Sequence, residues 1–363
     1  MRLGPLVRMI ARNRISLRTR YLARMLFLAQ SGFWSSLFSR LERMRYDQAL
    51  HNHPMPADPV FIIGHWRTGS TFLHQLMAQD PGMTAPTLFQ VAEPENFLVS
   101  YRYYKPIFAC VVGKHRPMDM VKLGMNEPQE DEYAIYRMTR SSPLEKLVFP
   151  QRDTYFLTGL ASFLPEGNDL SEWEERVAGF FKKIHFQSGR RIVSKNPFNS
   201  LRIPVLLKLF PEARFIHIVR NPLDSVPSTI KMWTIVQRQN CLNRNEYQPR
   251  AGEVCDVMNY MLDEIREQSR LIPQNRFAEI RFEDLERDPS GRLKTLYRNL
   301  EIPFTEGFEA NIRKFLGEVA DYQKNLFEMT EQDRNTITLK MKEFMSRYHY
   351  LDNFEPDKPN PPR

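Results

Sequence analysis

Short apolar runs rich in β-branched residues alternate along this chain with longer stretches in which apolar residues recur every three or four positions. The first pattern is typical of buried strands and the second of amphipathic helices. The short runs cover residues 60–64, 191–195, 214–220 and 277–282. The helical stretches cover residues 70–79, 172–187, 251–271 and 290–300. Strands that alternate with helices predict an α/β fold with a central parallel sheet covered by helices on both faces.

Chemically distinctive residues stand where the predicted strands end. Gly64, Lys195, Arg220 and Phe282 each end one of the four apolar runs. Ligands of open parallel sheets bind at the carboxyl ends of the strands. We therefore expect these four residues to meet at one edge of the sheet and to mark the functional site.

The first 45 residues form a basic arm with a helical pattern of its own. Its apolar residues recur at helical spacing between Leu17 and Leu41, and it contains ten arginines but only one acid, Glu42. The longest uncharged stretch, 25–39, has 15 residues, fewer than the roughly 20 apolar residues that span a bilayer. We predict a basic amphipathic helix that either lies on an anionic membrane surface or packs on the domain with its arginines in solvent. An organellar transit peptide is a third interpretation.

Net charge and cysteine content restrict the class of protein. The 363 residues carry a formal net charge of +8, and residues 1–45 alone supply +9, so the remainder is nearly neutral. A nucleic-acid-binding core is disfavoured, because its basic surface would lie within the folded domain. Three widely spaced cysteines form neither a disulfide framework nor a metal motif, which favours a reducing, cytoplasmic location. We expect a helical segment over 1–55, one α/β domain over 56–345 and a Pro-rich polar tail over 346–363.

The sequence Gly-His-Trp-Arg-Thr-Gly-Ser-Thr at 64–71 has its glycines at the spacing of a phosphate-binding P-loop, between a predicted strand and a predicted helix. Backbone N–H groups and the helix N-terminus of such a loop bind an anionic group. Ser70 stands where a nucleotide triphosphatase has its lysine, and the cation of this loop is Arg67 instead. The loop therefore predicts an anion site and argues against ATP or GTP hydrolysis.

A second candidate anion site follows the third predicted strand. Arg220-Asn-Pro ends this strand, and Ser228 lies eight residues further on in the following helical stretch. A guanidinium and a hydroxyl at this spacing can hold a second anionic group. The alternative is that Arg220 forms an ion pair with Asp224 at the start of the helix.

The two motifs together resemble those of the PAPS-dependent sulfotransferases, in particular the bacterial branch with arginine in the first loop. The resemblance covers residues 59–300 and implies the three-layer, P-loop-like fold of that family. The residues that it implies for the 5′-phosphosulfate of PAPS (3′-phosphoadenosine 5′-phosphosulfate) are Arg67, Thr68, Gly69, Ser70, Thr71 and Phe72. It assigns the 3′-phosphate to Arg220 and Ser228. Because residues 281–285 resemble the Tyr-Glu-Asp segment of the family, Phe282, or alternatively Phe72, would lie against the adenine.

The resemblance also implies how the reaction is catalysed. Sulfuryl transfer parallels phosphoryl transfer, in which positioning and charge stabilisation supply most of the catalysis. Arg67 and Lys195 are implied as the cations that neutralise the leaving group. No metal ion is expected, and the sequence has no His, Cys and carboxylate cluster at metal-ligand spacing.

The base that accepts the proton of the acceptor hydroxyl is less directly implied. Members of this branch often carry a histidine where this chain has Asn199, and an asparagine cannot take a proton. An acidic segment at 127–132 resembles one that precedes a helix in this branch. Its Glu130 is therefore the first candidate base, with Asp131 and Glu132 as further candidates. The alternative is that these acids only interact with the dipole of the helix.

Histidines elsewhere in the chain are reserve candidates for the base. His65 lies in the first loop, and His115 follows the aromatic stretch. His74 lies one turn into the first predicted helix, and we expect it to pack or to face solvent.

The acceptor is indicated only by composition. Residues 84–149 are rich in aromatic side chains and methionine, part of which is core. This richness and the basic arm favour an apolar acceptor such as a lipid, sterol, quinone or long-chain alcohol, with a saccharide as the second acceptor class. Two other function classes stay open: a P-loop nucleotide phosphotransferase, and a non-catalytic membrane-associated protein that keeps the nucleotide pocket. The missing lysine counts against the first, and only Asn199 suggests the second.

Overall fold

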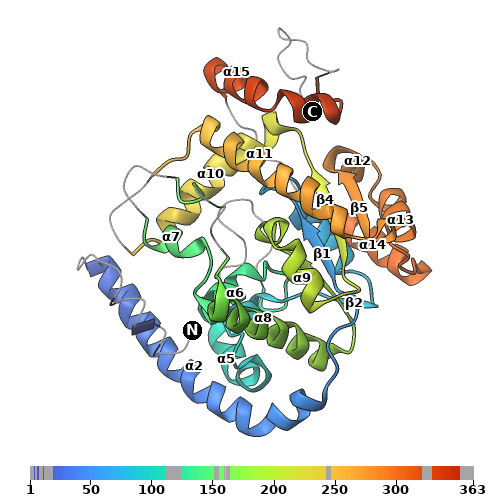
Figure 1. Ribbon diagram of the computed structural model, residues 1–363. Helices are drawn as coiled ribbons and strands as arrows, with labels where there is room; N and C mark the ends of the chain where they lie inside the picture. The colour runs from blue at the N-terminus through green and yellow to red at the C-terminus, as the bar shows by residue number, and fades with distance from the viewer. Residues whose placement is uncertain are drawn as a thin grey trace.

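A parallel five-stranded sheet forms the centre of the molecule, shown in the computed structural model of Figure 1. The structure describes residues 4, 6, 7, 11, 19–111, 124–150, 155–158, 160, 164–242, 247–320 and 329–351. The strands are β1 (Val60–Ile63), β2 (Met83–Thr84), β3 (Arg191–Lys195), β4 (Arg214–Val219) and β5 (Phe277–Arg281). The four predicted strands are confirmed. The sequence missed β2, because two residues are too few to show a period.

Strand order decides which loops are neighbours. The order is β2-β3-β1-β4-β5, and all neighbouring strands are parallel. Ile62 of β1 pairs with Lys195 of β3 on one side and with Ile216 of β4 on the other. The loop that follows β1 is therefore flanked by the carboxyl ends of β3 and β4, as the strand-end prediction requires.

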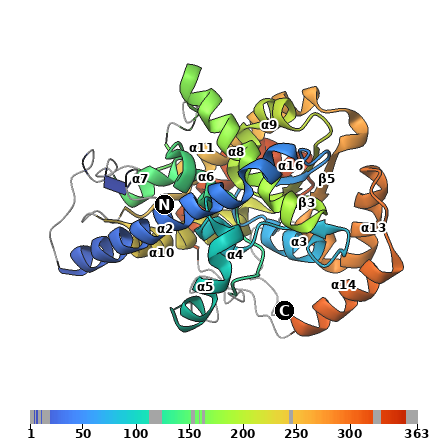
Figure 2. The same cartoon turned by 90° about the horizontal axis from the view of Figure 1, so that it is seen from below.

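Helices cover both faces of the sheet (Figures 1 and 2). Val60 and Ile62 join one apolar cluster, whereas Phe61 and Ile63 join another, because successive side chains of a strand point to opposite faces. The first cluster is covered by α3 (Ser70–Met77), α12 (Phe282–Arg287), α13 (Pro289–Asn299) and α14 (Glu306–Glu318). The second is covered by α4 (Leu88–Ala92), α5 (Phe97–Val111), α6 (Glu132–Thr139), α8 (Gly167–Ser188) and α9 (Ile203–Leu209). This is the predicted three-layer α/β architecture.

A third apolar cluster connects the loop after β1 to the C-terminal helices. It contains Trp66 of the loop, Phe198 and Trp233. Other members come from α7 (Leu144–Val148), α10 (Pro222–Asn240), α11 (Ala251–Gln268), α15 (Glu331–Lys340) and α16 (Lys342–Arg347). Short 3₁₀ turns cover Pro197–Leu201, Ser269–Leu271 and Gln274–Arg276. The predicted helices are confirmed, with ends that differ by a few residues.

From Thr19 onward the basic arm is part of a long helix, α2 (Thr19–Asn52). This helix lies along the edge of the molecule beside α5 and α8 (Figure 1). Its inner face carries small and polar residues in its second half. Ser35 accepts a hydrogen bond from Asn96, and the buried carboxylate of Glu42 pairs with Lys183 of α8. Glu42 also accepts a hydrogen bond from the N–H of Leu98 at 2.8 Å. The single acid of the arm thus anchors α2 to the domain.

The outer face of α2 is apolar. Its exposed large side chains are Leu22, Leu26, Phe27, Phe33, Trp34, Leu37, Leu41 and Met44. The packed-helix interpretation placed the arginines in solvent, and Arg40, Arg43 and Arg45 are exposed in this way while α2 packs on the domain. The structure adds a feature that this interpretation did not include, an apolar stripe on the outer face. No helix in the described ranges is long and apolar enough to span a bilayer.

Candidate active site

The loop between β1 and α3 is shaped by three residues with positive φ. They are Gly64 (φ 130°), Arg67 (φ 64°) and Gly69 (φ 88°). A Cβ atom on Gly64 would lie 2.6 Å from the carbonyl oxygen of Ile218 on β4, so only glycine fits between the two strands. The loop is held further by Thr68, whose hydroxyl donates to the carbonyl of His65 at 2.8 Å. A loop of this shape turns its backbone N–H groups toward the start of α3.

The N-terminus of α3 suits an anion. Gly69 is its N-cap residue, and no side chain caps the helix. The first N–H groups of a helix have no partner within the helix, and together with the helix dipole they favour a negative group. The predicted residues Ser70, Thr71 and Phe72 form this first turn. The structure therefore fits a phosphate or sulfate group at the predicted position.

The two predicted anion motifs lie together. The Nε of Arg67 donates to the Oγ of Ser228 on α10 at 2.8 Å. Arg220 follows β4, and its Nη1 donates to the carbonyl oxygen of Arg67 at 3.4 Å. Arg67 is thus in direct contact with two residues that follow it in the chain by 153 positions (Arg220) and 161 positions (Ser228).

Arg220 has capacity for a further partner. Its predicted alternative, an ion pair with Asp224, is present at 3.8 Å, and its hydrogen bond to Arg67 is also long. Its Nε is buried and has no hydrogen-bond partner among the described residues. A guanidinium with two long contacts and an unpartnered Nε fits a site for a second anionic group.

Phe282 links the two motifs from a third segment. The guanidinium of Arg220 lies 4.7 Å from the centroid of its ring. A Cβ atom on Gly69 would lie 2.0 Å from the same ring, so Phe282 packs directly on the backbone of the loop. Gly69 is therefore required both by its φ and by this contact. Phe72, the alternative aromatic residue, is partly buried against the apolar cluster beneath α3.

The acidic segment before α6 meets the end of β3. Lys195 forms an ion pair with the carboxylate of Glu130, and their side chains are 3% and 20% exposed. Beside them, the Oγ of Ser194 donates to Asp131 at 2.7 Å. The structure therefore brings a predicted cation and the first candidate base into contact at the carboxyl edge of the sheet.

The other two acids of this segment are buried. Burial raises the pKa of the Asp131 carboxyl to about 6. Glu132 is 1% exposed and accepts hydrogen bonds from both terminal nitrogens of Arg202 and from Asn196. Both carboxylates are thus buried against polar partners within the protein. Glu130 alone of the three has a partly exposed carboxylate at Lys195.

Asn199 and the histidines have structural contacts. Asn199 is 1% exposed, and its side-chain oxygen accepts a hydrogen bond from Arg202 at 3.3 Å. His65 is buried, with Nδ1 3.0 Å from the carbonyl of Trp66, and burial lowers the pKa of its imidazole to about 4. His74 packs as predicted, with Nε2 3.1 Å from the carbonyl of Val193. His115 lies outside the described residues.

Arg202 is a functional neighbour that the sequence analysis missed. It is fully buried and holds Glu132 and Asn199 beside the Lys195 strand end. A single arginine within the apolar stretch 201–207 was the available signal, because an isolated charge among core residues must have a buried partner.

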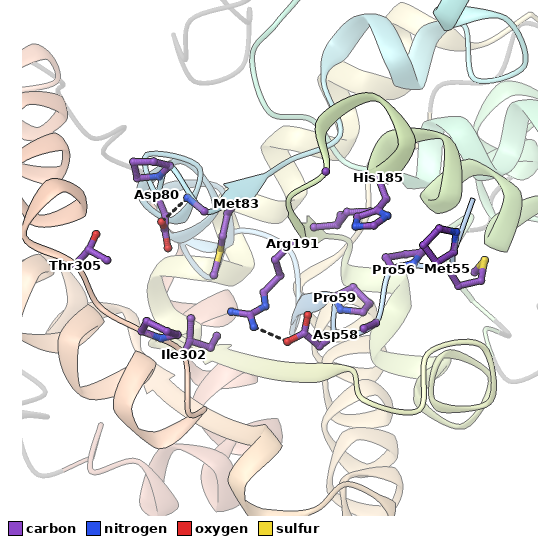
Figure 3. A pocket seen from close by; sticks show the side chains of 17 residues that line it. Met55, Pro56, Asp58, Pro59, Asp80, Met83, His185, Arg191, Ile302 and Thr305 are labelled. Carbon is purple, nitrogen blue, oxygen red and sulfur yellow. Dashed lines mark hydrogen bonds and ion pairs between the residues drawn. The ribbon is translucent and has the colours of Figure 1, made fainter. Parts of the chain in front are cut away.

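A cavity of about 650 Å³ lies elsewhere, at the amino ends of the strands (Figure 3). Pro59 before β1, Arg191 at the start of β3 and Ile302 line it, and Arg191 pairs with Asp58 at 2.5 Å. None of the predicted site residues lines this cavity. Among the described residues, no group of three or more His, Cys, Asp and Glu side chains could hold a metal ion.

Comparison with known proteins decides the family. Residues 59–306 match the model of the sulfotransferase family. This chain belongs to the sulfotransferase family. The matched range contains all five strands of the sulfotransferase and agrees with the range of the resemblance. The predicted enzyme class is confirmed, and the alternatives of a nucleotide phosphotransferase and of a non-catalytic protein are disfavoured.

Individual relatives support this result. The chain is 34% identical over 292 residues to omega-hydroxy-beta-dihydromenaquinone-9 sulfotransferase Stf3 of Mycobacterium bovis, a match that covers 80% of this chain and 75% of that protein. The solved structure of sulfotransferase STF9 from Mycobacterium avium has a TM-score of 0.66 at 19% identity, covering 88% of this chain and 82% of that one. Sulfotransferase STF1 from Mycobacterium tuberculosis H37Rv has a TM-score of 0.61 at 16% identity, covering 89% and 85%. The two structural matches confirm the fold.

Proposed function

We propose that this sulfotransferase transfers the sulfuryl group of PAPS to the hydroxyl of an apolar, quinone- or lipid-like acceptor at the edge where β1, β3 and β4 end. The observation that carries the proposal is the contact between the two anion motifs, in which Arg67 donates to Ser228. A donor with anionic groups on both the 5′ and the 3′ oxygen of its ribose needs two such sites at a fixed separation. An ordinary nucleoside diphosphate has no 3′-phosphate and would leave the second anion site empty.

We assign the residues that would hold the donor from the resemblance to the family, and the contacts between the two motifs support this assignment. The first turn of α3 and Arg67 bind the 5′-phosphosulfate, Arg220 and Ser228 bind the 3′-phosphate, and Phe282 offers its ring to the base. The bound donor supplies an activated sulfuryl group attached to a good leaving group. The chain supplies the charge stabilisation and the positioning.

Lys195 and Glu130 are the residues that we place at the reacting atoms. Lys195, together with Arg67, stabilises the negative charge that develops on the leaving phosphate oxygen. Glu130 accepts the proton of the acceptor hydroxyl. The ion pair with Lys195 uses one carboxylate oxygen of Glu130, and the other oxygen is the one that we propose accepts the hydroxyl proton.

The acceptor proposal rests on one relative and on the surroundings of the loop. The 34%-identical relative is named for a hydroxylated dihydromenaquinone, an apolar molecule with a hydroxyl group. In this chain, Trp66 of the loop contacts Phe198 and Trp233 at ring-centroid distances of 4.9 and 5.4 Å. These three rings are buried and give the loop an apolar core behind it, which is compatible with an apolar acceptor, and the relative carries the preference over a saccharide.

We also propose that the outer face of α2 rests on an anionic membrane from which the acceptor is taken. Phe33 and Trp34 are 56% and 44% exposed on this face. Helical spacing places Arg40 and Arg45 on the two sides of the apolar stripe. Apolar side chains flanked by arginines match the boundary between acyl chains and anionic headgroups. The inner face of α2 packs Met25 and Leu28 against the cluster that contains Trp66, so the helix stands between such a membrane and the site.

The first test is thermal stabilisation of the full chain by 3′-phosphoadenosine 5′-phosphate (PAP), with ADP and ATP–Mg²⁺ as controls. A ligand at 100 times its Kd stabilises the native state by about 2.7 kcal/mol, which raises Tm by a few degrees. We expect a rise with PAP at a concentration at which ADP has little effect. Equal rises with PAP and ADP, or a rise with ATP–Mg²⁺ alone, would refute the donor site.

A further inference from the structure

The segment that follows α16 returns to the sheet and packs on the donor edge. Tyr348 and Tyr350 lie in this segment and are 9% and 6% exposed. In Figure 1 the C-terminal helices lie at the end of the molecule remote from α2. The hydroxyl groups of both tyrosines donate to carboxylates of the β5–α12 region, which also carries Phe282.

The contact of Tyr350 continues to the peptide next to Arg220. Its hydroxyl donates to Oε2 of Glu283 at 2.8 Å, and Oε1 of Glu283 accepts from the backbone N–H of Asn221 at 3.0 Å. This N–H belongs to the peptide bond between Arg220 and Asn221. Glu283 therefore holds the backbone next to Arg220, whose guanidinium belongs to the second anion site. Tyr350 in turn holds the Glu283 carboxylate.

The neighbours of Glu283 reinforce this arrangement. The guanidinium of Arg281 lies 4.8 Å from the centroid of the Tyr350 ring. On the other side, Phe282 contacts both Arg220 and Gly69. Three consecutive residues thus connect the C-terminal segment to both donor motifs.

Tyr348 makes a parallel connection to the first motif. Its hydroxyl donates to Oε2 of Glu279 at 2.7 Å, and the same oxygen lies 2.8 Å from Nδ1 of His217. The His217 ring lies next to Gly64, where it would be 3.4 Å from an added Cβ atom. The two tyrosines therefore support the two strand ends that carry the loops of the donor site.

We propose that Tyr350 is a positioning residue for the 3′-phosphate site: through Glu283 it fixes the Arg220–Asn221 peptide and so sets the preference of the enzyme for 3′-phosphorylated nucleotides. This inference rests on the proposed donor site. Tyr350 has no direct role in binding, because its hydroxyl is committed to Glu283 and its ring to Arg281. Without that hydroxyl, the partly buried carboxylate of Glu283 loses one of its two hydrogen-bond donors, and the Arg220–Asn221 peptide that it holds becomes less rigidly placed.

The test measures the Kd values of PAP and ADP for the full-length wild type and Tyr350→Phe by calorimetry. Because a hydrogen bond to a charged group contributes more than a neutral one, we expect the Kd of PAP to rise about tenfold, with little change for ADP. Tyr297→Phe is the matched control, since this buried hydroxyl donates to Asp80 away from the site. It should leave the ratio of the two Kd values unchanged. Glu283→Gln, which retains Tyr350, should shift the ratio in the same direction as Tyr350→Phe.

The outcomes separate the two proposals. If the wild type prefers PAP but Tyr350→Phe and Glu283→Gln keep its ratio, or weaken both nucleotides equally, the positioning role is refuted and the donor site stands. If the wild type does not distinguish PAP from ADP, the donor site itself is refuted, and the role of Tyr350 falls with it.

Discussion

Glu130 carries the proton-transfer step of the proposed reaction, and its surroundings single it out among the acids of its segment. It is partly exposed and paired with Lys195, whereas Asp131 and Glu132 face buried polar partners. The sequence analysis placed Glu130 first among these three consecutive acids, and the exposure of the three carboxylates supports that order. Glu130 and Asp131 both contact β3, at Lys195 and Ser194, and they differ in that only Glu130 is partly exposed.

We expect Glu130→Gln to lower kcat by about 10²–10³, within the range that a general base contributes, and to leave the Kd of PAP nearly unchanged. The glutamine keeps the size of the side chain but cannot accept a proton. The measurement is steady-state transfer of labelled sulfate from PAPS to an ω-hydroxylated quinol. Glu127→Gln, three residues earlier in the same segment, is the control and should retain activity. A Glu130→Gln enzyme with wild-type kcat would exclude this residue as the base.

At the scale of elements, α2 combines two faces that usually do not occur together in a soluble protein. Its inner face is anchored by Ser35 and Glu42, while its outer face carries exposed aromatic and leucine side chains. Because water disfavours such a stripe, the arrangement supports a lipid surface as the partner of this helix.

Replacing Phe33 and Leu37 with glutamate should reduce binding to vesicles that contain anionic lipid at least tenfold, because both apolar contacts are lost and two negative charges are added. Co-sedimentation with vesicles measures this effect, and Tm should stay close to the wild-type value because both side chains are exposed. Leu339→Glu is the matched control, an exposed leucine on α15 at the far end of the molecule (Figure 1). Equal vesicle binding by the double variant and by this control would argue against the proposed membrane face.

At the scale of the whole molecule, two buried groups make the stability respond to pH in opposite directions. Burial raises the pKa of Asp131 to about 6, above its unfolded value, so this group stabilises the fold increasingly as the pH falls from 7 toward 4. Burial lowers the pKa of His65 to about 4, so this group loses its stabilising contribution as the pH falls below 6.5. The two effects partly cancel in the wild type.

Asp131→Asn should therefore lose stability more steeply on acidification than the wild type does, because it lacks the compensating protonation. Urea unfolding at pH 7, 5.5 and 4 measures this difference, and the asparagine can still accept the hydrogen bond of Ser194. His65→Gln is the complementary variant and should gain stability relative to the wild type on acidification, because it lacks the group whose protonation favours the unfolded state. Parallel profiles of the wild type and Asp131→Asn would contradict the assignment.

The sequence by itself determined the features that are local in the chain. The strand ends at Gly64, Lys195 and Arg220 follow from apolar runs of a few residues, and the anion loop follows from glycines at a fixed spacing. These patterns predict the α/β fold and the donor motifs, because a short segment carries both the element and the chemistry. The resemblance to sulfotransferases rests on the same segments, and the family match confirmed it.

Only the tertiary structure decided the contacts between distant segments. Arg202 takes the buried partners Glu132 and Asn199, α2 turns its apolar stripe outward, and Tyr350 reaches Glu283 across 67 residues. None of these three features is announced in the sequence by a periodic pattern or a motif. Each depends on which surfaces meet when the helices pack on the sheet, and this packing follows from the shape and burial of the whole chain.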